Sequence, residues 1–161
     1  MFIMKLQEHL MILNLSRSIA RMDNIVFEKI WQDENFIELK ISVNSEFVSA
    51  FQNCYVHDSA LIYISDKILD YVNNYHENCY LELGKKEGNY TPAFSMDILP
   101  ADVSGNVKIE VDIEIADNDI RSHRAVFYVK SELGLIEKLG KAFKFLVNEE
   151  VGIEVSLLPE F

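Results

Sequence analysis

The stretch VKIEVDIEI, residues 107–115, alternates between apolar and charged side chains without a break. Successive side chains of a β-strand point to opposite faces of a sheet, so this spacing predicts a strand with one face in a hydrophobic core and the other in water. Such half-buried strands are typical of antiparallel sheets. The segment therefore predicts an antiparallel sheet with one apolar face and one acidic face.

Other segments predict strands that would complete this sheet. Phe36–Val43 and Phe47–Val56 are joined by Asn44 and Ser45, which favour a turn, and together they predict a hairpin. The remaining predicted strands are Cys79–Leu83, Tyr90–Leu99, Arg124–Lys130 and a short closing strand at Gly152–Leu158.

Three segments have helical spacing. Apolar residues recur at three- and four-residue steps from Leu61 to Tyr75, after two residues, Asp58 and Ser59, that favour a helix N-cap. Ser131 is in position to cap a last helix at Glu132–Val147. Residues 3–22 also fit a helix, and residues 1–21 belong either to the fold or to a helical extension upstream of it. The predicted fold is α+β: a single antiparallel β-sheet with helices packed on one face, in one domain over residues 1–161.

Composition excludes several classes of protein. The 161 residues include 15 Lys and Arg against 26 Asp and Glu, for a formal net charge of −11. A nucleic-acid-binding protein is not expected, because such proteins rely on cationic contacts to phosphate. No apolar run reaches the roughly 20 residues of a membrane span, and the first residues lack the pattern of a signal peptide. We expect a cytoplasmic protein with reduced cysteines, Cys54 and Cys79, and no contact with membranes or nucleic acid.

The acidic side of residues 107–115 is the main candidate binding surface. Glu110, Asp112 and Glu114 share one face at intervals of about 6.6 Å, given a rise of about 3.3 Å per residue, and Asp117 and Asp119 extend the charge into the following turn. This face is either an ordinary solvated strand face or a docking surface for a basic partner.

Trp31 is a second candidate for partner binding, because tryptophan is enriched among interface hot spots. Its alternative interpretation is a residue in the core or at the edge of the core.

No catalytic, cofactor or metal site is predicted. Successive carboxylates on one strand lie too far apart to share an ion, and the four histidines have no metal-ligand spacing. Cys54 and His57 fall on opposite faces of their predicted strand, which argues against a Cys/His nucleophile. The sequence therefore does not predict an enzyme.

The region from about Tyr80 to Leu146 resembles a known family. The resemblance rests on the stretches SMDILP (95–100), GNV (105–107) leading into the alternating strand, HRAVFYV (123–129) and ELGL (132–135). They are similar to small bacterial immunity proteins of the WapI-like kind, which are encoded beside polymorphic or contact-dependent toxins. The resemblance implies an inhibitor role and assigns no binding residue, because toxin-contacting residues vary within such families.

Charge and resemblance lead to one functional hypothesis. It is a cytoplasmic immunity protein that binds a cognate toxin, expected to be a basic protein such as a nuclease, and occludes its active site. The alternative is an acidic secretion chaperone or adaptor that holds an apolar segment of an effector. Both functions are compatible with a monomer or a homodimer.

Overall fold

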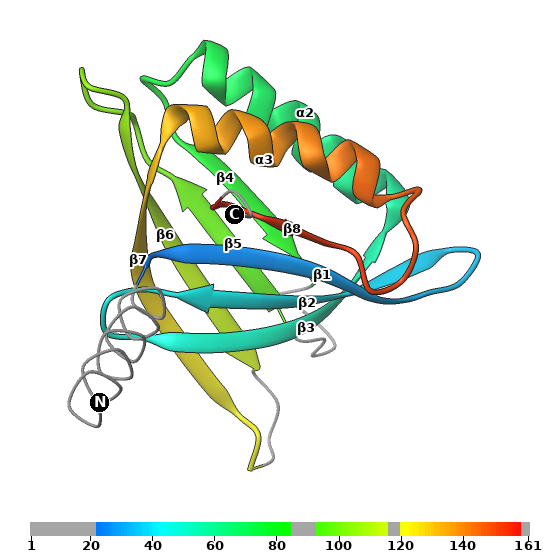
Figure 1. The fold of residues 1–161 in the computed structure, drawn as a ribbon. Coiled ribbons are helices and arrows are strands. Elements are labelled where there is room, and N and C mark those ends of the chain that lie inside the picture. The colour runs from blue at the N-terminus through cyan, green and yellow to red at the C-terminus, as the bar shows by residue number, and fades with distance from the viewer. Residues whose placement is uncertain (1–21, 85–92, 116–119, 159–161) are drawn as a thin grey trace, which may run out of the picture.

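The computed structural model describes residues 22–84, 93–115 and 120–158, and within them the chain forms two helices and two antiparallel sheets (Figure 1). The predicted helix over residues 3–22 falls almost entirely outside the described residues. The elements are β1 (Asn24–Gln32), β2 (Phe36–Asn44), β3 (Ser49–His57), α2 (Asp58–Asn73), β4 (Cys79–Leu83), β5 (Ala93–Ile98), β6 (Asn106–Ile115), β7 (His123–Glu132), α3 (Leu133–Leu146) and β8 (Glu154–Ser156).

The prediction of a single sheet is wrong, although the α+β class is confirmed. Four strands in the order β3-β2-β1-β8 form sheet A, and four in the order β4-β5-β6-β7 form sheet B. Helix α2 begins immediately after β3 and separates the first three strands of sheet A from sheet B in the sequence, and β8 returns to sheet A after α3. Alternation along a strand reveals which side is buried but not which strands are its neighbours, so two sheets around one core produce the same sequence pattern as one larger sheet.

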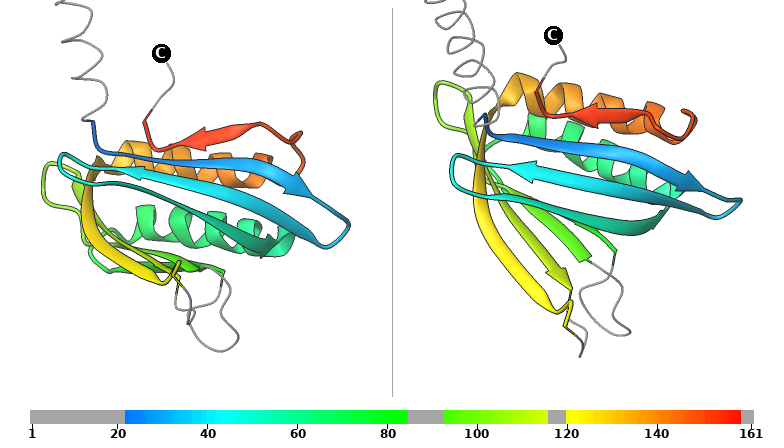
Figure 2. Two further views of the ribbon diagram at one scale, coloured as in Figure 1. Left: turned by 90° about the horizontal axis from the view of Figure 1, so that it is seen from below. Right: turned by 60° about the horizontal axis from the view of Figure 1, so that its bottom comes forward.

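The core lies between sheet A, sheet B and the pair of helices, as the turned views show (Figure 2). Phe27 of β1 joins the three parts, with its ring centroid 5.8 Å from that of Phe94 in sheet B and 4.8 Å from that of Phe143 in α3. The two helices lie side by side and meet where the Ser65 hydroxyl donates a hydrogen bond of 2.6 Å to the carbonyl of Gly140. One continuous hydrophobic cluster therefore holds both sheets and both helices together.

Strand β1 was not predicted from the sequence. Ile25 and Phe27 point into the core, but the third inward position is Lys29, whose side chain is fully buried. Its ammonium group donates hydrogen bonds to the carbonyl oxygens of Leu146, Val147 and Glu149, at 3.2, 3.0 and 2.6 Å. A charge at an inward position interrupts the apolar alternation, and for this reason the strand escapes pattern-based prediction.

Both helices begin without the predicted side-chain caps. The N-cap residues are His57 and Glu132, and neither makes a side-chain capping bond. Ser131 lies inside β7 as a buried residue rather than at the helix start. Each helix instead continues directly from a strand, so the sheet fixes the entry of the chain. Neither described helix has the length and apolar character needed to span a bilayer.

Candidate binding surface on sheet B

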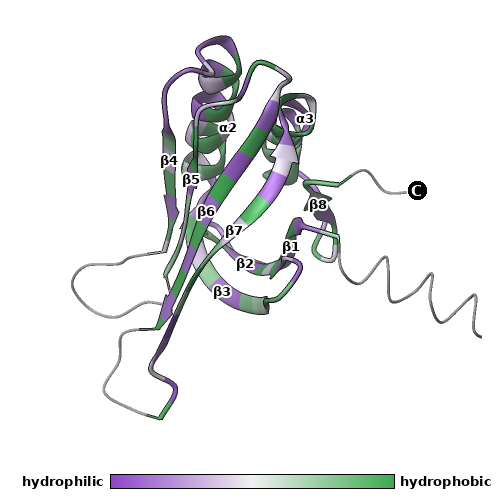
Figure 3. Ribbon diagram, turned by 90° about the vertical axis from the view of Figure 1, so that its left-hand side faces the viewer, coloured by the Kyte–Doolittle hydropathy of each residue, from purple (hydrophilic) through white to green (hydrophobic). Residues whose placement is uncertain are grey.

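The outer face of sheet B is the side turned away from sheet A and the helices, and Figure 3 shows hydrophilic and hydrophobic residues alternating along its strands. The registers of β4, β5, β6 and β7 place its side chains in rows across the sheet. No described element packs on this face. The residues whose side chains form it are Tyr80, Glu82, Ser95, Asp97, Lys108, Glu110, Asp112, Glu114, Arg124, Val126, Tyr128 and Lys130.

One row combines two tyrosines with two carboxylates. Tyr80, Asp97, Glu110 and Tyr128 are register partners across the four strands. The Tyr128 hydroxyl donates a 2.7 Å hydrogen bond to the Glu110 carboxylate, and this bond together with the negative charge raises the pKa of Tyr128. The row therefore presents exposed aromatic rings beside oriented negative charge.

Asp97 is held in the middle of this row. Its Oδ2 accepts a 2.8 Å hydrogen bond from the Asn78 amide, while its Oδ1 is buried and has no hydrogen-bond partner in the described structure. Glu110 lies directly opposite it on β6. Like charges at directly opposed positions of a sheet are unfavourable for the isolated protein, so this row gains from a cation placed beside it.

Asp112 differs from the other two predicted carboxylates, because it is only 8 % exposed. The Arg124 guanidinium binds both of its oxygens, with Nε–Oδ1 and Nη2–Oδ2 distances of 3.1 and 2.8 Å. The paired Asp112 carboxylate in turn raises the pKa of Arg124. Of the three predicted carboxylates, Asp112 is therefore engaged in an ion pair within the chain, whereas Glu110 and Glu114 are partly exposed.

The other predicted site residues do not join this surface. Trp31 lies in β1 of sheet A with 42 % of its surface exposed, and its ring packs edge-on against Tyr55 at a centroid distance of 6.1 Å. It is therefore neither a core residue nor a neighbour of the sheet B carboxylates. Asp117 and Asp119 lie outside the described residues.

Sequence reasoning missed most members of the surface, among them Tyr80, Glu82, Asp97 and Tyr128. The signal for the first two was present, because apolar residues at 79, 81 and 83 leave 80 and 82 on the opposite face. Asp97 and Tyr128 could be assigned to this face only from the pairing of their strands. Their contribution changes the surface from a purely acidic row to a mixed aromatic and acidic one.

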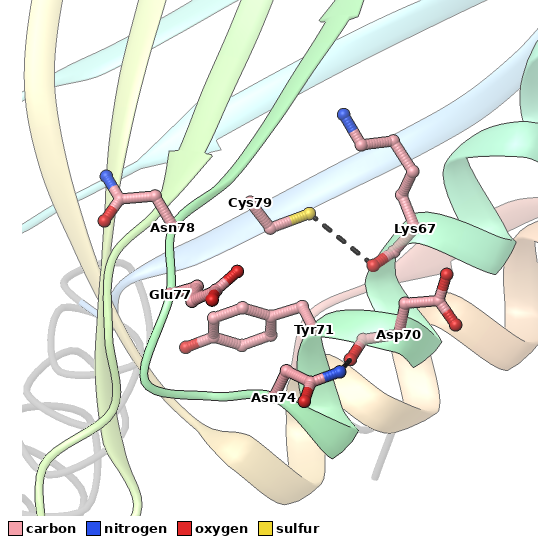
Figure 4. A pocket seen from close by; sticks show the side chains of 7 residues that line it. All are labelled: Lys67, Asp70, Tyr71, Asn74, Glu77, Asn78 and Cys79. Carbon is pink, nitrogen blue, oxygen red and sulfur yellow. Dashed lines mark hydrogen bonds between the residues drawn. The ribbon is translucent and has the colours of Figure 1, made fainter.

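A small polar cavity of about 190 Å³ lies between the end of α2 and the start of β4 (Figure 4). Cys79 lines it, with Sγ 3.7 Å from the carbonyl oxygen of Lys67, and burial raises the pKa of this thiol. Burial also raises the pKa of Tyr71 to about 12, and its hydroxyl donates to the carbonyl of Leu99. Both groups are thus protonated near neutral pH, which disfavours a nucleophilic role.

The described residues contain no group of three or more His, Cys, Asp or Glu side chains arranged to hold a metal ion. Comparison of the chain with known proteins found no matching family model, curated protein or solved structure.

Proposed function

We propose that this chain is a binding protein of the immunity type: a cytoplasmic inhibitor that uses the outer face of sheet B to cover the active site of a basic toxin. The observation that supports it is the juxtaposition of Glu110 and Glu114 with the half-exposed rings of Tyr80 and Tyr128 on a sheet face that no described element covers.

Charge on this face favours a cationic partner. Once the Asp112–Arg124 pair is set aside, the remaining carboxylates are Glu82, Asp97, Glu110 and Glu114, against two lysines, Lys108 and Lys130. The two lysines are register partners near one end of the face. Complementary potential accelerates association and selects the partner, and the overall charge of −11 acts in the same direction.

The tyrosines provide a different kind of contact. Tyr80 and Tyr128 lie on the two edge strands of sheet B, so they flank the central carboxylates from either side. Tyrosine is enriched in interface hot spots because its ring buries a large area and its hydroxyl can bond at the rim. In this proposal, carboxylates occupy the places of substrate phosphates beside the toxin's lysines and arginines, and the tyrosines add affinity. The inhibitor acts by occlusion and requires no cofactor.

The proposal is tested with the double variant Glu110→Lys/Glu114→Lys, co-expressed with the product of the adjacent gene. Asp112 is left unchanged because Arg124 depends on it. We expect association at least tenfold slower and a weaker dependence of the association rate on salt. The matched control is Glu34→Lys/Glu46→Lys, which changes the net charge equally at two exposed positions in the turns of sheet A. Equal association rates for the two double variants would rule out the outer face of sheet B as the interface.

A second candidate function, an adaptor that holds an apolar segment of an effector, is favoured by sheet A. Trp31, Phe36, Phe51 and Tyr55 are all exposed large hydrophobic residues on or next to the outer face of this sheet. Surface aromatic clusters of this kind often mark interaction sites. Substituting Trp31 and Tyr55 by Ser tests the adaptor function. Loss of effector binding by a variant that still folds would support this function, and unchanged effector binding would exclude it.

A further inference from the structure

Strand β7 lies at one edge of sheet B, where no other described strand pairs with it, and two observations show which of its backbone groups lie along that edge. The carbonyl of Lys108 accepts a hydrogen bond from the amide of Leu99. The backbone N–H and C=O groups of the even-numbered residues of β6 are therefore directed toward β5. The register partners of these residues on β7 are also even-numbered, and their backbone N–H and C=O groups are therefore directed away from β6. Consistently, the amide of Lys130 donates to the Asp23 carboxylate at 2.6 Å rather than to a strand. The amides and carbonyls of Arg124, Val126 and Tyr128 thus face outward.

The other edges are less suited to pairing. Strands β4 and β8 are short, with five and three residues. The edge strand β3 lies against sheet B: the Gln52 side chain donates to the carbonyl of Glu114 at 3.1 Å, and β3 contacts β4, β5 and β6. Strand β7, in contrast, has ten residues without proline, and its register with β6 is uninterrupted. Long, regular edge strands are templates for pairing with another chain unless something blocks them.

We propose that an extended, basic segment of the partner protein adds to sheet B as a fifth strand, paired with β7 at Arg124–Tyr128. This inference rests on the proposed function and specifies how the partner binds. Backbone hydrogen bonds to the outward groups of residues 124, 126 and 128 would supply affinity independent of sequence, and alternate side chains of the added strand would supply specificity.

The carboxylates on the outer face of sheet B favour a basic segment as the added strand. Alternate side chains of an added strand would lie on the outer face, about 5 Å from β7 and about 10 Å from β6, at the usual strand spacing. Val126 is the smallest exposed side chain on this part of β7 and lies between Tyr128 and Arg124. A lysine or arginine opposite Val126 can extend over it toward Glu110 and Glu114, since the intervening Arg124 is already paired with Asp112.

A second copy of this chain is a poorer occupant of the same edge. Pairing β7 with itself would bring two molecules of charge −11 together with their acidic faces in one continuous surface. A basic segment meets attraction where a second copy meets repulsion.

The test uses a synthetic eight-residue peptide of alternating lysine and valine as the probe, with a matched peptide that is N-methylated at every second residue. Binding to the full chain is measured by shifts of backbone amide resonances. We expect the unmethylated peptide to shift and protect the amides of residues 124, 126 and 128 more than those of 125, 127 and 129. We expect the methylated peptide, which keeps its charge and loses strand donors, to bind at least tenfold more weakly.

Two protein variants complement the peptides. Val126→Pro removes one outward amide, which an edge position tolerates, and should weaken peptide binding about tenfold; Val126→Thr keeps the amide and should bind like the wild type. If Val126→Pro fails to fold, the two peptides still test the proposal. Equal binding of both peptides, sensitive to Glu110→Lys/Glu114→Lys, would overturn strand addition while leaving the acidic face as the interface. Absence of binding would overturn strand addition, and so would dimerisation of the free chain through β7, which would identify a second copy as the occupant.

Discussion

The buried ammonium group of Lys29 donates a hydrogen bond to the carbonyl oxygen of Leu146, the last residue of α3, at 3.2 Å. Bonds to two further carbonyls, of Val147 and Glu149, occupy its remaining donors. The last carbonyls of a helix have no partner within the helix, and a cation at this end also interacts favourably with the helix dipole. A strand residue of sheet A therefore caps a helix that follows it by more than one hundred residues.

Lys29→Met tests this cap. Methionine retains much of the buried volume but leaves carbonyls of the α3 C-terminus without their donor, so we expect a loss of about 2–4 kcal/mol in the free energy of unfolding. Lys40→Met is the matched control on the neighbouring strand: Lys40 is partly exposed and forms a 3.7 Å ion pair with Glu28, worth about 0–1 kcal/mol. Urea denaturation measures both. Similar midpoints for the two variants would contradict a structural role for the buried ammonium group.

The crossing of α2 and α3 depends on a missing side chain at Gly140. A Cβ atom at this position would lie 2.7 Å from Cγ2 of Ile68. Gly140→Val should therefore destabilise the protein by about 1–3 kcal/mol through overpacking. Gly134→Ala in the same helix has open space around the new methyl group, and it should stabilise by up to about 1 kcal/mol through helix propensity. Thermal unfolding would reveal the opposite signs, and two shifts of the same sign would disprove the close crossing.

The Asp112–Arg124 pair is predicted to stabilise sheet B rather than to bind partner. Arg124→Gln leaves a largely buried carboxylate without its bidentate ligand, so we expect a loss of about 1–3 kcal/mol. Glu114→Gln changes a neighbouring carboxylate of the same strand that is more exposed, and it should alter stability by less than about 0.5 kcal/mol. Equal losses in chemical denaturation would contradict the distinction between the internal and the accessible carboxylates.

The two thiols should be unreactive in the folded protein. Burial raises the pKa of Cys54 to about 12 from its ordinary value of 9.0, and it also raises the pKa of Cys79. At pH 8 we expect alkylation of both by iodoacetamide, followed by mass spectrometry, to be slower by at least tenfold than in 6 M urea, since the thiolate is the reactive form. Rapid modification of either thiol under native conditions would contradict their burial.

The same shift predicts a pH dependence of stability. The folded state retains the Cys54 proton while the unfolded state loses it, so this contribution is fully present below pH 9 and is lost as the pH rises from 9 toward 12. Cys54→Ala should reduce the loss of stability between pH 9 and pH 10.5, as measured by urea denaturation. An unchanged slope in the variant would exclude Cys54 as its source.

The local pattern of apolar residues was sufficient to predict most helices and strands. Strand β6 and helices α2 and α3 lie close to their predicted bounds, because each has an unbroken apolar period. Strand β1 was missed because its third inward residue is a lysine, which is tolerable only where carbonyls from a distant helix surround it. The outward direction of Glu110 and Glu114 followed from alternation alone, whereas the burial of Asp112 depended on Arg124, a residue of the next strand.

The sequence by itself determined which side of each strand meets the core, because side-chain direction along a strand is set by backbone geometry within a few residues. The net charge of the chain and the shared face of Glu110, Asp112 and Glu114 were likewise evident from the residues alone. Only the tertiary structure decided that the strands divide into two sheets, that Tyr80 and Asp97 join Glu110 in one row, and that β7 is left at an edge. These relations join residues far apart in the chain, and strand pairing depends on the packing of the whole core rather than on any local period.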